Sequence, residues 1–106
     1  DKEGTGKGFD VELTSEINRL VTIPVIAHGG PGMKKDVVDL VKLSNVSSVM
    51  ISSMFHYSYI KDNESFASSA EGNTQFLKNK MTLNKLNPCS IADLKNELNK
   101  NNITCR

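Results

Sequence analysis

The sequence has few cysteines, almost no net charge and no long apolar run, and each absence argues against a class of protein. Cys89 and Cys105 belong to no C-x-x-C pair or cysteine–histidine cluster, which argues against a metal site and predicts free thiols, with a disulfide as the minor alternative. The 13 basic and 12 acidic residues leave a net charge of +1, too little for a nucleic-acid or anionic-membrane surface. No segment reaches the roughly 20 apolar residues of a membrane span. No charged start followed by an apolar block suggests a signal peptide, so the expected location is the cytoplasm.

The length of 106 residues is enough for one small domain and too short for two. The chain opens at Asp1, without methionine, directly in the glycine-rich loop D-K-E-G-T-G-K-G, and we expect it to be a piece of something longer. A P-loop is excluded here because Lys7 is followed by Gly8 instead of serine or threonine, and because no strand precedes the loop.

The most informative stretch is I-P-V-I-A-H-G-G-P-G at residues 23–32, an apolar run that stops at glycines. It predicts a strand over Val25–Ala27, buried on both faces, followed by a tight turn at Gly29 and Gly30. Apolar residues then recur at helical spacing from Met33 to about Leu43. The free N–H groups and positive dipole end of that helix would face the glycines, which suits phosphate best.

A second apolar run, Val49–Ser52, predicts a strand that ends in Ser52 and Ser53 and leads into the mixed segment M-F-H-Y. Two strands separated by one helix form a βαβ unit, whose parallel strands end at the same edge of the sheet. The paired glycines and the paired serines should therefore face one corner. This convergence predicts a phosphate site.

The flanking segments carry weaker signals. Asp10 is the predicted N-cap of a helix with one apolar face. That face comprises Leu13, Ile17, Leu20 and Val21. Residues 61–88 read as an irregular insertion, with a helical turn near residues 75–80. Ser90 then caps a final helix, with Asp93 in a weak capping box. The predicted organisation is thus 1–60, 61–88 and 89–106.

Three motifs together resemble a known family. In order and spacing, D-K-E-G-T-G-K-G-F-D, I-P-V-I-A-H-G-G-P-G and S-V-M-I-S-S-M-F-H-Y resemble the last part of HisF, the cyclase subunit of imidazole glycerol phosphate synthase, and S-I-A-D-L-K-N-E-L resembles its closing helix. The resemblance implies an α/β fold, the C-terminal portion of a (β/α)8 TIM barrel covering about units 6 to 8. It also implies a lyase-class cyclase of histidine biosynthesis that needs no cofactor.

In that family, ammonia from a HisH-type glutaminase partner enters a phosphorylated small-molecule substrate. The two catalytic aspartates lie near the ends of the first and fifth barrel strands, outside this chain, so the resemblance assigns no catalytic residue here and implies that the 106 residues alone turn nothing over. What it assigns is a substrate-phosphate half-site. The matching residues are Glu3, Gly4, Thr5, His28, Gly29, Gly30, Ser52 and Ser53.

At three positions the sequence departs from the family pattern, so a HisF-like paralogue with another function remains an alternative. Glu3 replaces the usual aspartate, and Pro31 replaces the small residue of the usual G-G-A-G. His28 replaces a serine, cysteine or alanine. His28 could donate to a phosphate, although a packed, hydrogen-bonded histidine is the commoner state. His56 matches a family residue to which we assign a structural role. The alternative is a HisF-like ammonia-dependent synthase of surface-sugar amidination.

Two adjacent strands do not make a self-sufficient parallel sheet, because they have too few partner strands and their edges lack cover. We therefore expect the chain to need the remaining barrel or to self-associate. A further, non-enzymatic alternative is a stand-alone phosphate-binding or interaction module.

Overall fold

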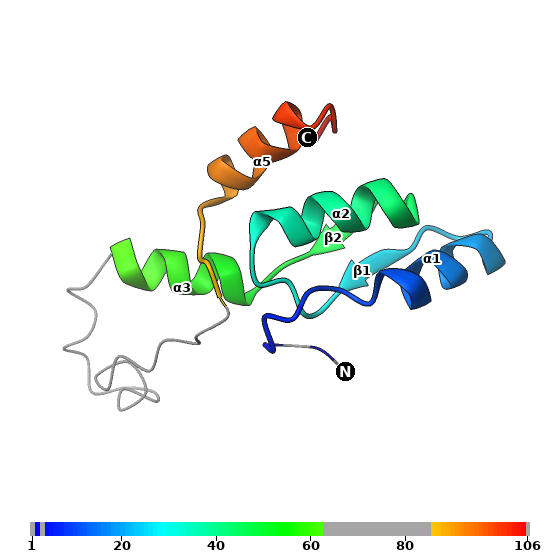
Figure 1. Ribbon diagram of the computed structural model, residues 1–106, viewed down its shortest axis with the longest axis horizontal. Helices are drawn as coiled ribbons and strands as arrows, with labels where there is room; N and C mark the ends of the chain where they lie inside the picture. The colour runs from blue at the N-terminus through cyan, green and yellow to red at the C-terminus, as the bar shows by residue number, and fades with distance from the viewer. Residues whose placement is uncertain (1, 3, 63–85, 106) are drawn as a thin grey trace.

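Two short parallel strands lie at the centre of the structure, a computed structural model that describes residues 2, 4–62 and 86–105 (Figure 1). Strand β1 pairs with β2, and Ile26, Ala27 and His28 lie opposite Ser48, Val49 and Met50. The elements in chain order are α1 (Val11–Leu20), β1 (Ile26–His28), α2 (Lys34–Ser44), β2 (Ser48–Met50), α3 (Ser53–Asp62) and α5 (Ile91–Lys100). This arrangement confirms neighbouring parallel strands joined through a helix, and it is compatible with the predicted α/β class.

Two of the predicted helix starts are confirmed by their caps. The Asp10 side chain accepts from the Leu13 N–H at 3.2 Å, and this hydrogen bond lowers the pKa of the Asp10 carboxyl. At the start of α5, the Ser90 hydroxyl accepts from the Asp93 N–H at 3.1 Å, and Asp93 accepts from the Ser90 N–H at 3.1 Å. Both ends of this capping box are therefore formed.

The sheet is covered on one face only, so the prediction of burial on both faces is wrong. Ala27 is 5% exposed, whereas Ile26 and Met50 are 59% and 54% exposed on the other face. Side chains alternate between the faces of a strand, and α2 lies along one face of β1 and β2 (Figure 1). Within the described residues, no second layer of helices covers the face that carries Ile26 and Met50.

Helix α1 forms where predicted, but its apolar face is not the packed one. The predicted face stays exposed, from 38% at Val21 to 69% at Leu20, and α1 has no buried residue. The helix instead contacts α2 through a polar side, where Asn18 Nδ2 donates to the carbonyls of Ser44 and Asn45 at 3.2 and 3.3 Å. Helical periodicity gives the apolar face but not the element that covers it.

The core lies between α2, the sheet and α5. Leu40 and Met54 are fully buried, and Val37 is 2% exposed. Ser44 is a buried polar residue whose hydroxyl donates to the Leu40 carbonyl at 2.6 Å. The other buried hydrophobic residues are Phe9, Ala27, Val38, Val46, Cys89, Leu94 and Leu98.

The segment after β2 differs from its prediction. M-F-H-Y is not a mixed segment but belongs to α3, and the Ser52 carbonyl accepts from the N–H groups of Phe55 and His56 at 3.1 and 3.0 Å. The helical turn expected near residues 75–80 lies outside the described residues. At Asn87 the chain contacts the β1–α2 turn, where the Asn87 N–H donates to the Gly32 carbonyl at 2.6 Å.

Both cysteines are free thiols. Burial raises the pKa of the Cys89 thiol. In the part of the chain that the structure describes, no helix has the length and apolar character needed to cross a bilayer.

Candidate anion-binding site

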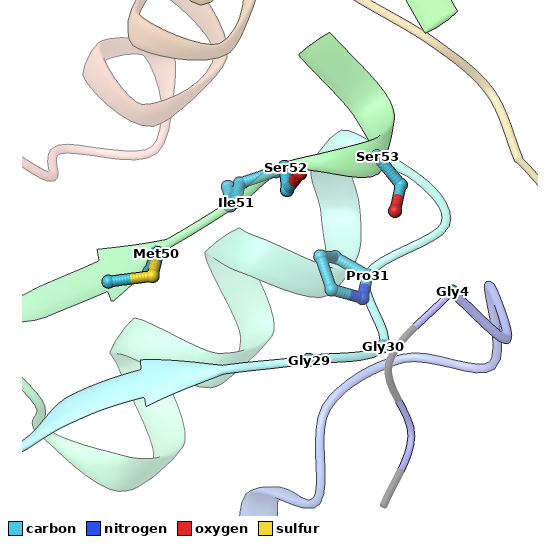
Figure 2. Close-up of a pocket in the computed structure, with 8 residues that line it drawn as sticks. All are labelled: Gly4, Gly29, Gly30, Pro31, Met50, Ile51, Ser52 and Ser53. Carbon is cyan, nitrogen blue, oxygen red and sulfur yellow. The ribbon is translucent and has the colours of Figure 1, made fainter. Parts of the chain in front are cut away.

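A small pocket lies where the two strands end. Three segments surround it: the N-terminal loop, the turn between β1 and α2, and the turn between β2 and α3 (Figure 2). The lining residues are Gly4, Gly29, Gly30, Pro31, Met50, Ile51, Ser52 and Ser53. Parallel pairing of β1 with β2 brings these turns together, because both strands run toward the same edge.

Most of the predicted site residues lie in this pocket. The paired glycines, the paired serines and Gly4 line it. Thr5 does not line it, and its hydroxyl instead donates to the Lys2 carbonyl at 2.7 Å. His28 is the last residue of β1, exposed and opposite Met50, and is not a lining residue. Glu3 lies outside the described residues.

Gly30 is a position that only glycine fits. Its φ of +101° lies in the left-handed region, and a Cβ built on it would lie 2.2 Å from the Gly8 carbonyl oxygen. The two backbones approach so closely because the Gly8 N–H donates to the Gly30 carbonyl at 2.8 Å. The N-terminal loop is therefore held against the β1–α2 turn by main-chain contact, and Gly4 is held at the pocket.

Neither the N-cap residue Met33 nor any residue of α2 lines the pocket. The N–H groups of Gly32 and Met33 both donate to Asp36 Oδ2, at 2.7 and 3.0 Å. A carboxylate of the protein thus already accepts from the N–H groups of the N-cap residue of α2 and of the residue before it.

The helix that serves the pocket is α3, which the sequence prediction missed. Its first residue is Ser53, which lines the pocket, and Ser52 precedes it at the N-cap position. The first N–H groups of a helix have no partner within the helix, and they carry the positive end of its dipole. Figure 2 shows the Ser53 hydroxyl pointing from the start of α3 toward the side where Pro31 and Gly4 lie. The available sequence signal was a serine in the N-cap position.

The lining side chains carry no charge, and their polar groups are hydroxyls. Hydroxyl and backbone N–H donors beside a helix N-terminus match the chemistry of an anion. Among the residues placed by the structure, no group of three or more His, Cys, Asp or Glu side chains gathers in a way that could hold a metal ion.

The fold and the pocket define an α/β protein in which two parallel strand ends and a helix N-terminus surround a small polar site. The model of the family described as "Histidine biosynthesis protein" matches residues 1–61, and the chain belongs to this family.

Three curated relatives agree with this assignment, and each of the three is an imidazole glycerol phosphate synthase subunit HisF. The protein from Hydrogenobaculum sp. is 43% identical over 60 residues, which cover 57% of this chain and 24% of the relative. That from Methanopyrus kandleri is 44% identical over 57 residues, 54% of this chain and 21% of the relative. The protein from Clostridium beijerinckii is 42% identical over 57 residues, which cover 54% of this chain and 22% of the relative. The resemblance to HisF is confirmed, and the match spans less than a quarter of each of these relatives.

Proposed function

We propose that this chain forms a substrate-phosphate half-site of a HisF-type cyclase. In this proposal the described elements are the last βα units of a (β/α)8 barrel. The reaction joins ammonia from a HisH-type glutaminase subunit to a phosphorylated aminoimidazole precursor and yields imidazole glycerol phosphate. The aspartates that act as acid and base would lie on other barrel strands, so the 106 residues alone are expected to bind phosphate without turning substrate over.

The observation that carries the proposal is the shared pocket of Gly29, Gly30, Ser52 and Ser53 at adjacent parallel strand ends. In TIM barrels, phosphate sites frequently lie in the loops after strands 7 and 8, with the N-terminus of a short extra helix. Helix α3, which begins directly after β2, matches that helix in place. The family match over residues 1–61 contains every residue that lines the pocket.

The expected role of the pocket is positioning. A phosphate held by N–H and hydroxyl groups would fix one end of the substrate, and its binding energy would hold the reacting end in place on the rest of the barrel. Gly29 and Gly30 have positive φ angles of +92° and +101°, which allow their backbone to approach such a ligand without a Cβ.

Phosphate binding can be tested by ¹H–¹⁵N correlation spectroscopy of the 106-residue chain during titration with inorganic phosphate. We expect saturable shifts of the amides of Gly29, Gly30 and Ser53, and weaker binding by the double variant S52A/S53A. The matched control is S58A, because Ser58 lies within α3 away from the pocket. Shifts spread evenly over the chain, or none, would refute the phosphate site.

The reaction can be tested with a chimera. The matched segment of the Hydrogenobaculum HisF is replaced by the aligned residues of this chain, and the chimera is expressed in a histidine auxotroph that lacks HisF. We expect growth without histidine, and loss of growth when the chimera also carries S52A/S53A. A soluble chimera that binds phosphate but does not rescue growth would count against histidine biosynthesis and favour the surface-sugar synthase.

A further inference from the structure

We propose that Lys2 supplies the cation for this pocket and that Asp10 competes with the bound anion for the Lys2 ammonium group. This inference rests on the proposed phosphate site and adds a charged residue that does not line the pocket. The resemblance assigned Glu3, Gly4 and Thr5 from this loop to the site, but not Lys2.

The loop holds Lys2 beside the pocket. A Cβ built on Gly30, a lining residue, would lie 3.1 Å from the Lys2 Cβ. The Lys2 carbonyl accepts from the Thr5 N–H at 3.1 Å and from the Thr5 hydroxyl at 2.7 Å. These two hydrogen bonds close a turn through Gly4, which itself lines the pocket. The stem of Lys2 therefore starts next to two of the pocket's glycines.

The ammonium group of Lys2 forms a weak, exposed ion pair with the Asp10 carboxylate. Lys2 Nζ lies 3.4 Å from Asp10 Oδ2, and the two side chains are 42% and 47% exposed. Exposed ion pairs are weak, and lysine carries its charge on a flexible four-carbon stem. Lys2 can therefore exchange Asp10 for a phosphate at small cost.

The pocket needs such a cation, because its lining offers only neutral donors to a charged ligand. Hydrogen bonds between two charged partners are shorter and stronger than those with a neutral donor.

A purely structural role for Lys2 makes a different prediction. If Lys2 only neutralised the Asp10 cap, D10N would leave phosphate affinity unchanged, because asparagine is as good an N-cap as aspartate. If Asp10 competes for Lys2, D10N keeps the cap and releases the ammonium group to the ligand. A lower Kd for D10N than for the parent chain would therefore indicate competition, and an unchanged Kd would indicate a purely structural role for Lys2.

The test is a titration of the 106-residue chain and its variants with inorganic phosphate, followed at the amides of Gly29 and Gly30. We expect K2M to raise the Kd about tenfold and K2R to retain binding. D10N should lower the Kd about two- to fivefold. The matched control K7M, an exposed lysine of the same loop, should leave the Kd unchanged.

Each outcome bears on one of the two proposals, provided that the spectra show a fold common to all variants. Equal Kd values for K2M and the parent chain would overturn the role of Lys2 and leave the phosphate site standing. A D10N Kd equal to or above that of the parent would overturn the competition. No binding by the parent chain would overturn the phosphate site, and this inference with it.

Discussion

Replacing Gly30 by alanine should detach the N-terminal loop from the strand end. The substitution forces a Cβ into a backbone with φ +101° and to within 2.2 Å of the Gly8 carbonyl oxygen. That atom belongs to the main chain, so no rotation of a side chain can relieve the clash. The loop has to move, and the hydrogen bond from Gly8 N–H to the Gly30 carbonyl breaks.

The cost has two parts. The left-handed backbone conformation costs a residue with a Cβ about 1–2 kcal/mol. Loss of one backbone hydrogen bond adds about 0.5–1.5 kcal/mol. We therefore expect the free energy of unfolding to fall by about 2–3 kcal/mol. Gly4 is the matched control: its φ is +67°, but nothing lies within 4 Å of a Cβ built there, so G4A should incur only the backbone term.

Urea unfolding of the chain and of both variants measures these costs, and amide hydrogen exchange reports on the loop. G30A should be the less stable variant by about 1 kcal/mol, with faster exchange at the Gly8 N–H than in G4A. Equal stabilities, together with an unchanged exchange rate at Gly8, would refute the argument that this contact holds the loop.

Three further predictions concern the rest of the fold. L40A should cost about 2–5 kcal/mol in urea unfolding, because Leu40 is fully buried, whereas L43A, at a residue 67% exposed, should change stability by less than about 0.5 kcal/mol; equal effects would contradict the described core. The hydrogen bond from the Ser90 hydroxyl lowers the folded-state pKa of Asp93, so its stabilising effect should be present at neutral pH and disappear as the pH falls through that lowered value. S90A should raise the Asp93 pKa measured by NMR. An unchanged Asp93 pKa would show that the Ser90 hydroxyl does not cause the shift. Because one sheet face and the apolar side of α1 are exposed, the folded chain should self-associate and elute as an oligomer; a monomer with protected amides at Val25–Ala27 and Val49–Ile51 would refute this.

Local signals predicted the parts of this fold that local forces determine. The caps at Asp10 and Ser90 could be predicted because an N-cap side-chain oxygen accepts a hydrogen bond from the N–H group only three residues later in the sequence. The pairing of the strands and the pocket at Gly29, Gly30, Ser52 and Ser53 followed from chain connectivity.

What could not be predicted depends on contacts between elements, or on helices with weak periodicity. The side of α1 that faces α2 carries Asn18, which donates to the carbonyls of Ser44 and Asn45, and no pattern within α1 indicates this contact. Helix α3 was missed because aromatic, polar and apolar residues alternate in it without a clear face. The Asp36 carboxylate was missed because Met33 at the N-cap does not resemble a capping box.

The contact between Gly8 and Gly30 consists of main-chain atoms, and this has a consequence for how the loop can change over evolutionary time. A main-chain hydrogen bond carries no side-chain identity, so an exposed neighbour such as Lys7 is open to drift without loosening the loop. Selection would act instead on the lack of a side chain at Gly30. A library randomised at residue 7 should keep its members folded, while one randomised at residue 30 should return glycine almost exclusively.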